Sequence, residues 1–178
     1  MRIYLMRHGN ALDVGEQGVR RDSERPLSDK GVETCREVAQ GLVTLGVNPD
    51  LVVSSPLVRA RQTAEVVAET LGGRPLSLSP LLAPSGSLPD LLDWLHKGLW
   101  DSVLLVGHMP DLAVLASLLL CSHPNAGIDF KKSAVCCIAF LGRPAPGSGD
   151  LQWFLPPKPL IMIARGKRHP AGSEPHEP

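Results

Sequence analysis

The chain has 178 residues, enough for one domain or one domain with a tail, and a single core of this size buries about 70% of the surface that the unfolded chain exposes. Hydrophobic residues make up 43% of the sequence and charged residues 20%, so the composition is that of an ordinary globular protein. The 18 basic and 18 acidic residues cancel, and this zero net charge argues against a general nucleic-acid binder, which needs a basic surface.

The first quarter of the chain predicts a buried strand, a loop and a helix. Residues 3–6 form a short continuous apolar run, which is typical of a strand covered on both faces. A polar loop follows over residues 10–26. Ser28 is expected to cap a helix whose apolar residues recur at helical spacing, and Gly46 is expected to end it.

A second strand and a second helix are expected next. Residues 51–53 form another apolar run. Ser55 is expected as the N-cap of the helix and Pro56 as its first residue. The two glycines at positions 72 and 73 are expected to end this helix.

The middle of the chain predicts a third strand and helix after an irregular region. Residues 76–78 form a candidate short strand, and residues 79–88 are rich in Pro, Ser and Gly, as in a loop. A helix is expected over residues 90–99, and a buried strand over residues 103–106. A helix that is apolar nearly all round, and therefore deeply packed, is expected over residues 110–120.

The last part of the chain predicts two strands and a tail. The strands are expected over residues 134–141 and 151–155, joined by a turn rich in Gly and Pro. From residue 165 onward the chain is polar and has no apolar periodicity. We therefore expect one domain over residues 1–163 and a polar C-terminal tail over residues 164–178.

Strands that alternate with helices predict an α/β fold, a three-layer α/β/α sandwich with a mainly parallel central sheet and helices on both faces. In such sheets ligands bind beyond the carboxyl ends of the strands. Arg7 and His8 follow the first strand, Arg59 lies in the first turn of the second helix, and His108 follows the strand over residues 103–106. We therefore expect these four side chains to meet at one edge of the sheet.

Taken one at a time, these residues have ordinary structural explanations. A histidine after a strand, such as His108, is more often structural than catalytic. An arginine in a first helical turn, such as Arg59, is usually a solvated surface residue, and the helix dipole disfavours a cation there. A phosphate bound at that helix N-terminus removes the penalty, so the coincidence of these side chains favours a phosphate site.

Four segments carry a more specific pattern: Arg-His-Gly at residues 7–9, Arg-Pro-Leu-Ser at 25–28, Ser-Ser-Pro-Leu-Val-Arg-Ala-Arg-Gln-Thr-Ala at 54–64, and Gly-His at 107–108. In this order and spacing they resemble the histidine phosphatase superfamily, also called phosphoglycerate mutase-like, over about residues 1–160. The second segment and the short loop before it resemble the SixA-type phosphohistidine phosphatase branch.

The resemblance implies a phosphatase in which His8 attacks phosphorus, becomes phosphohistidine and is regenerated by water. It implies catalytic roles for His8, His108, Arg7 and Arg59, and it places Arg25 at the phosphate together with Arg7, Arg59 and His108. The residue types suit this chemistry, because an imidazole with a pKa of about 6.5 is a nucleophile near neutral pH and arginines bind phosphate oxygens. The neighbouring arginines are expected to lower the pKa of His8.

Three details stay open at this point. Arg25 is either a phosphate ligand or an exposed loop arginine. The carbonyl of Gly9 is a candidate partner for the second ring nitrogen of His8. His108, if protonated, adds a donor for the charge that develops in the transition state.

The segment after the second helix bears on the substrate. Many members of the superfamily carry there a carboxylic acid that protonates an alcohol leaving group, whereas residues 76–88 contain no Asp or Glu. A phosphohistidine needs less help, because its distal ring nitrogen takes a proton near neutral pH and a neutral imidazole departs. We therefore expect the substrate to be phosphohistidine on a signalling or carrier protein, with small phosphate esters possible and Asp13, Asp90 or Asp111 as an acid from elsewhere.

Two other functions fit the same residues. One is a broad-specificity small-molecule phosphomonoesterase or mutase that uses His8 in the same way. The other is a non-catalytic phosphoprotein-binding module, against which the retention of His8, Arg7, Arg59 and His108 argues. No cofactor and no metal are implied, because the arginines supply the positive charge and no histidine pairs convincingly with another ligand at helical spacing.

Two further features bear on the compartment. Arg7 interrupts the first apolar run too early for a signal-peptide core, and residues 112–121 are too few to span a bilayer, so a cytoplasmic protein with no membrane partner is expected. The four cysteines form no CxxC pair and are expected to be small buried residues in a reducing compartment. They are Cys35, Cys121, Cys136 and Cys137.

Overall fold

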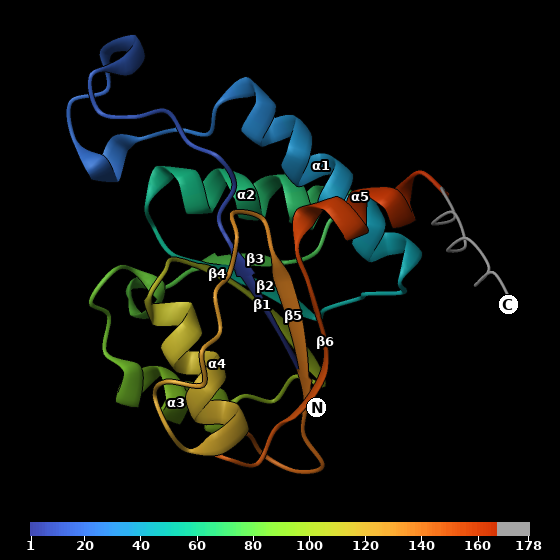
Figure 1. Ribbon diagram of the computed structural model, residues 1–178. Helices are drawn as coiled ribbons and strands as arrows, with labels where there is room; N and C mark the ends of the chain where they lie inside the picture. The colour runs from blue at the N-terminus through green and yellow to red at the C-terminus, as the bar shows by residue number, and fades with distance from the viewer. Residues whose placement is uncertain (167–178) are drawn as a thin grey trace, which may run out of the picture.

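The computed structural model describes residues 1–166 as a six-stranded sheet with helices on both faces (Figure 1). The strands lie in the order β3-β2-β4-β1-β5-β6. The first four strands of the chain are parallel to one another, and the last two pair in antiparallel fashion at one side. Their bounds are β1 Arg2–Arg7, β2 Leu51–Ser54, β3 Leu76–Leu78, β4 Ser102–Gly107, β5 Val135–Ala139 and β6 Asp150–Leu155.

The helices form the two outer layers, so the predicted three-layer sandwich with a mainly parallel sheet is confirmed (Figure 1). One face of the sheet is covered by α1 Asp29–Thr44, α2 Val58–Thr70 and α5 Pro157–Ala164. The other face is covered by α3 Leu88–Lys97 and α4 Asp111–Cys121. Short 3-10 turns lie between β1 and α1 and before α3, namely η1 Glu16–Gly18, η2 Asp22–Glu24 and η3 Pro80–Leu82.

Strand β1 shows why its sequence is apolar throughout. Ile3 and Leu5 belong to the core that α3 and α4 cover, whereas Tyr4 and Met6 belong to the core that α1 and α2 cover. Successive side chains of a strand point to opposite faces, so a strand in the middle of a three-layer fold needs apolar residues at every position.

The start of α1 is as predicted, and the starts of α2 and α3 are not. Ser28 caps α1 by accepting a hydrogen bond from the backbone of Gly31. Helix α2 begins at Val58 and not at Pro56, so Ser55 is not its cap; the Ser55 hydroxyl instead accepts from the N–H of Leu57 at 3.3 Å and shares a hydrogen bond with His108. Helix α3 begins two residues earlier than expected, because Ser87 is its cap.

Helix α5 is not predicted, and its N-terminal region contains prolines at positions 156, 157 and 159. They lie before the helix or in its first turn, where no intrahelical partner for an N–H is lost. Its buried residue Leu160 packs against α1 so closely that a Cβ on Gly41 would lie 2.2 Å from the Leu160 carbonyl oxygen. Ala164 ends α5, and the greater part of the predicted tail, residues 167–178, lies outside the described residues.

The cysteines follow the expectation with one exception. All four are free; Cys35, Cys136 and Cys137 are buried, but Cys121 is exposed because it is the last residue of α4. Within residues 1–166, no helix combines the length and the apolar character needed to cross a bilayer.

Candidate active site

Three neighbouring parallel strands bring their carboxyl ends together at one end of the sheet. β1, β4 and β2 are adjacent, and the residues that follow them are His8, His108 and Ser55. The two histidine rings lie 5.0 Å apart between centroids. Arg59, in the first turn of α2, reaches the same place, and all three charged or imidazole side chains are buried: His8 is 7% exposed, Arg59 5% and His108 3%.

The tautomer of His8 follows from its hydrogen bonds. Nδ1 lies 2.8 Å from the carbonyl oxygen of Gly9, which only accepts, so Nδ1 carries the proton. The other ring nitrogen, Nε2, keeps its lone pair and accepts a hydrogen bond from Nε of Arg59 at 3.2 Å. The carbonyl of Gly9 therefore does what the sequence suggested, and it leaves Nε2 as the nitrogen available to an electrophile.

The pKa of His8 is lowered to about 3, so the imidazole is neutral at neutral pH. Burial is the largest cause; His108, Arg59 and Arg7 add to it, and the hydrogen bond to Gly9 acts in the opposite direction. The expected effect of the arginines is present, but it is smaller than the effect of removing the ring from water.

Gly9 is required by close packing under the nucleophile. A Cβ at this position would lie 2.5 Å from Sγ of Cys35, which is closer than such atoms approach. The N–H of Gly9 donates to Oγ1 of Thr63 at 3.0 Å, and Thr63 donates to the carbonyl of Arg59 at 2.7 Å. Thr63 is not among the residues that the sequence predicts for the site; it lies one turn after Arg59, on the buried side of α2.

His108 is also neutral in this structure. Its pKa is lowered to about 4, mainly by burial and then by Arg59 and Arg7, while Asp22 opposes the shift. Nε2 shares a hydrogen bond of 2.8 Å with the hydroxyl of Ser55. Nδ1 is buried and finds no hydrogen-bond partner among residues 1–166, so one polar atom of the ring is left for a ligand.

Arg7 is held by one end of its guanidinium. Nη1 donates to the carbonyl of Phe130 at 2.7 Å, whereas the buried Nε has no partner within the described part of the chain. Burial lowers the pKa of Arg7. A buried guanidinium nitrogen without a partner is costly, so this side chain is suited to receive an anion.

Arg25 is not the exposed loop arginine of the alternative interpretation, because its side chain is only 19% exposed. Nε donates to the carbonyl of Leu12, Nη1 to Oδ1 of Asp22 at 3.0 Å, and Nη2 to Oδ1 of Asp13 at 2.5 Å. Arg25 is therefore joined to the site through Asp22, which also binds Arg59.

Asp22 is the second residue of the site that the sequence does not predict. From η2 its backbone carbonyl and its Oδ2 accept hydrogen bonds from Nη1 and Nη2 of Arg59, at 2.7 and 3.0 Å. Hydrogen bonding to Arg25 and then the charge of Arg59 lower the pKa of its carboxyl. Its position three residues before Arg25 fits the ion pair with Arg25, but nothing in the sequence marks its contact with Arg59.

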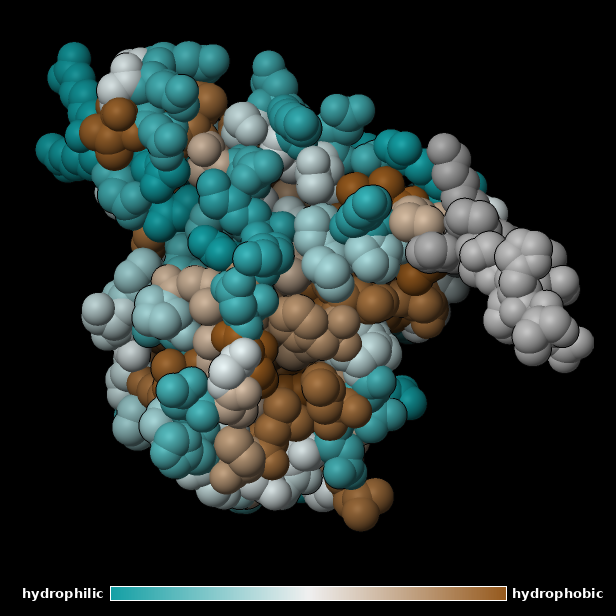
Figure 2. Space-filling model, viewed as in Figure 1, coloured by the Kyte–Doolittle hydropathy of each residue, from teal (hydrophilic) through white to brown (hydrophobic). Residues whose placement is uncertain are grey.

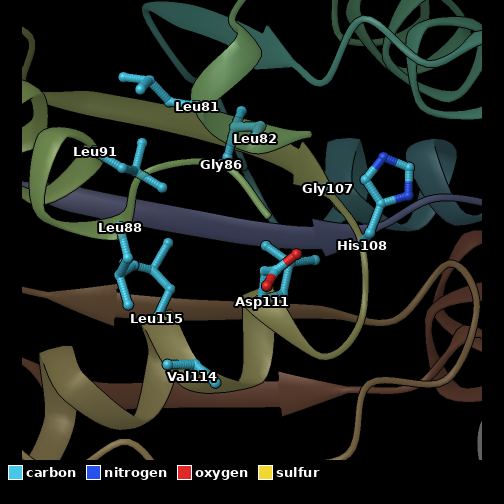
Figure 3. Close-up of a pocket in the computed structure, with 11 residues that line it drawn as sticks. Leu81, Leu82, Gly86, Leu88, Leu91, Gly107, His108, Asp111, Val114 and Leu115 are labelled. Atoms are coloured by element: carbon cyan, nitrogen blue, oxygen red, sulfur yellow. The ribbon is translucent and has the colours of Figure 1, made fainter. Parts of the chain in front are cut away.

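A small apolar cavity of about 40 Å³ lies beside His108 (Figure 3). Its walls come from the turn after β3, from α3 and from the start of α4, and Asp111 is its carboxylate. Of the other two carboxylates considered as acids, Asp13 is paired with Arg25, and Asp90 lies in the first turn of α3. The leucines that line the cavity are Leu81, Leu82, Leu88, Leu91, Leu112 and Leu115.

No group of three or more His, Cys, Asp or Glu side chains within residues 1–166 is placed to hold a metal ion. The site instead combines a neutral imidazole nitrogen with guanidinium donors. Such a combination can accept a phosphoryl group at Nε2 of His8 and hold its oxygens with Arg7 and Arg59.

Comparisons with known proteins agree in sequence and in structure. The model of the histidine phosphatase superfamily (branch 1) matches residues 3–83, which include His8, Arg25 and Arg59 but not His108. An uncharacterized protein of Picosynechococcus sp. is 36% identical over 168 residues, which are 92% of this chain and 99% of that protein.

Two further proteins similar to this chain are described by an activity. The phosphohistidine phosphatase SixA of Escherichia coli (strain K12) is 30% identical over 168 residues, covering 91% of this chain and 98% of that protein. The solved structure of the protein histidine phosphatase SixA complexed with tungstate has a TM-score of 0.76 and 30% identity, covering 90% of this chain and 99% of that one.

Proposed function

The chain belongs to the histidine phosphatase superfamily and is a phosphatase, and we propose that it removes the phosphoryl group from phosphohistidine on a signalling or carrier protein, with His8 as nucleophile. The observation that carries this proposal is the state of His8. Its Nδ1–H is held by the Gly9 carbonyl, so the lone pair of Nε2 faces the arginine-lined site. An imidazole that is neutral and oriented in this way needs no general base before it attacks.

In the first step, Nε2 of His8 forms a bond to phosphorus while the bond from phosphorus to the ring nitrogen of the substrate breaks. The electron pair of that bond stays on the departing nitrogen, and the proton already on the distal nitrogen makes the leaving imidazole neutral. Arg7, Arg59 and His108 hold the equatorial oxygens, where the charge develops. Arg59 has to release Nε2 of His8 for this step, since it donates to the same lone pair in the empty site.

In the second step, water attacks the phosphorus of phosphorylated His8. The bond between phosphorus and Nε2 breaks, the proton of the water passes to the phosphate product or to solvent, and His8 returns to its neutral form. The hydrogen bond from Nδ1 to Gly9 holds the ring through both steps, so the same nitrogen receives and releases the phosphoryl group.

The choice of phosphohistidine over an alkyl phosphate rests on the residues beside His108. The segment after β3 contributes Leu81, Leu82 and Gly86 to the cavity there, and it contains no carboxylate. An alcohol leaving group would find no acid in this segment, whereas imidazole departs without one. The similarity to the phosphohistidine phosphatase SixA of Escherichia coli supports the same substrate class.

Hydrolysis of small phosphate esters is the second candidate, and one observation favours it. Asp111 lines the cavity that His108 also lines, so a carboxyl group is present near the site, although it comes from α4 and not from the segment after β3. A small-molecule phosphomonoesterase or mutase would use Asp111 as its acid.

The decisive experiment is rapid mixing of the protein with a phosphohistidine peptide, followed by a quench in alkaline detergent, because the phosphorus–nitrogen bond is acid-labile. We expect a transient phosphoryl group on His8, its loss with release of inorganic phosphate, and neither event in the His8→Ala variant. An absence of label on His8 would refute the nucleophile. Binding without turnover would indicate a phosphoprotein-binding module, and faster turnover of an alkyl phosphate would refute the substrate class.

A further inference from the structure

Two arginines of the proposed phosphate site, Arg25 and Arg59, are already bound to an anionic side chain of the protein itself. All three guanidinium nitrogens of Arg59 donate a hydrogen bond: Nε to His8, and Nη1 and Nη2 to the carbonyl and carboxylate of Asp22. All three nitrogens of Arg25 donate as well, and Nη1 does so to the other carboxylate oxygen of Asp22. The carboxylate of Asp22 thus bridges two arginines in the way that a phosphate would.

The two arginines are much more buried than the aspartate that binds them. The side chains of Arg59 and Arg25 are 7% and 19% exposed, whereas that of Asp22 is 60% exposed. A buried guanidinium needs an anionic or polar partner at all times, but a half-exposed carboxylate can turn into water at little cost. An incoming anion therefore exchanges with Asp22, while the two guanidinium groups remain buried.

The segment that carries Asp22 can move without disturbing the core. It lies between β1 and α1, stands out from the sheet as a separate lobe in Figure 1, and has a largely hydrophilic surface in Figure 2. Neither of its two short turns, η1 and η2, contains a buried residue. Its attachments to α2 include the two hydrogen bonds from Arg59 to Asp22 and the one that Gln62 accepts from Leu27.

We propose that Asp22 is a specificity-determining residue of the phosphate site, whose carboxylate competes with the bound anion for Arg25 and Arg59. A singly charged ligand that replaces it gains little, because one carboxylate is exchanged for another. A phosphoryl group gains more, because it brings a second charge and a third oxygen. The same competition favours the release of inorganic phosphate after the second step.

This inference rests on the proposed function, because it takes Arg59 to be a phosphate ligand. Its test is the dissociation constant of inorganic phosphate, measured by calorimetry with the full chain. Asp22→Asn keeps the size of the side chain but removes its charge, and we expect it to bind phosphate about three to ten times more tightly. Asp22→Ser, which also removes the amide, is expected to change the constant in the same direction.

Glu24→Gln is the matched control. Glu24 lies in the same short turn and carries the same charge, but its ion pair is with Arg21 at 3.9 Å and not with the site. We expect an unchanged dissociation constant for this variant. An equal tightening in Glu24→Gln would show a general charge effect, and unchanged or weaker binding in both Asp22 variants would overturn the proposal.

The Arg59→Ala variant distinguishes a failure of the role given to Asp22 from a failure of the proposed phosphate site. If the loss of Arg59 weakens phosphate binding but Asp22→Asn does not tighten it, the role given to Asp22 is wrong and the phosphate site stands. If the loss of Arg59 leaves phosphate binding unchanged, the proposed phosphate site itself is wrong.

Discussion

Gly9 and Thr63 are joined by a buried hydrogen bond in which the Gly9 N–H donates to Oγ1 of Thr63 at 3.0 Å. Thr63 lies on α2 and donates its own proton to the carbonyl of Arg59 one turn earlier. The carbonyl of Gly9 accepts the hydrogen bond from His8. Thr63 is therefore a positioning residue that fixes the loop of the nucleophile against the helix that carries Arg59.

We predict that Thr63→Val lowers kcat by about tenfold and leaves KM nearly unchanged. Valine has the shape of threonine but leaves the buried N–H of Gly9 without a partner, which costs about 1–3 kcal/mol. Thr63→Ser restores the hydroxyl and should restore kcat. Steady-state kinetics with a phosphohistidine peptide measures both constants.

Thr70→Val is the control for this prediction. Thr70 lies on the same helix and makes the same kind of hydrogen bond, to the carbonyl of Val66 at 2.7 Å, but it is the last residue of α2, about two turns beyond Thr63. A kcat that falls equally in both variants would mean that Thr63 supports only the helix.

Gly9 and Cys35 should be energetically coupled. We predict that Gly9→Ala destabilises the protein by about 1–3 kcal/mol, because the new Cβ overlaps Sγ of Cys35. Cys35→Ala should cost about 1 kcal/mol by itself through the cavity it leaves. The double variant should be more stable than the sum of the two losses predicts, because the second change removes the overlap.

Urea unfolding of the four proteins in this cycle gives the coupling energy. Additive losses would show that the cost of Gly9→Ala does not come from the overlap with Sγ of Cys35. In that case the loop that carries His8 adjusts its backbone to the new methyl group, and we expect kcat of Gly9→Ala to fall because His8 is displaced.

Acid should weaken the fold through the two buried histidines. His8 and His108 have pKa values of about 3 and about 4 in the folded protein, against about 6.5 in an unfolded chain. The unfolded chain therefore binds more protons between pH 4 and 6.5, and stability rises with pH across that window. We expect the free energy of unfolding to fall from pH 7 to pH 5 by about 1 kcal/mol per pH unit for each histidine.

Urea unfolding at several pH values above 5 tests this, because most carboxylates stay ionised there. His8→Gln should remove about half of the pH dependence. His123→Gln, which changes an exposed histidine, should leave it unchanged. A slope that is the same in wild type and His8→Gln would mean that folding does not lower the pKa of His8.

Local patterns were sufficient to predict the strands, the layers and the sheet edge at which His8, Arg59 and His108 lie. Each of these depends on a short apolar run and on the polar residue just after it, and both are visible in the sequence. Helix α5 was not predicted, because the effect of a proline depends on its position within the helix. The burial of Cys35 was predicted, and the exposure of Cys121 was not.

The roles of Asp22 and Thr63 could not be predicted in the same way. Asp22 contacts Arg59, which is 37 residues away, through a loop whose path depends on Arg25 and on the turns η1 and η2. Thr63 acts through the backbone of Gly9, and no residue type marks a backbone N–H that needs a partner. The lowered pKa of His8 was expected from its neighbours, but burial, which the sequence does not display directly, is the larger cause.

A variant of Asp111 distinguishes the two candidate substrate classes, phosphohistidine and alkyl phosphates. Asp111 is the carboxylate that lines the cavity beside His108, and a general acid for an alcohol leaving group contributes about 100-fold or more. We predict that Asp111→Asn leaves the turnover of a phosphohistidine peptide within about twofold and lowers any hydrolysis of an alkyl phosphate by at least about tenfold. Asp90→Asn is the control, because Asp90 also lies in the first turn of a helix and is not part of the cavity. An Asp111→Asn variant that loses both activities equally would show that the departing imidazole also takes its proton from Asp111, and the preference for phosphohistidine would then need another cause than the missing acid.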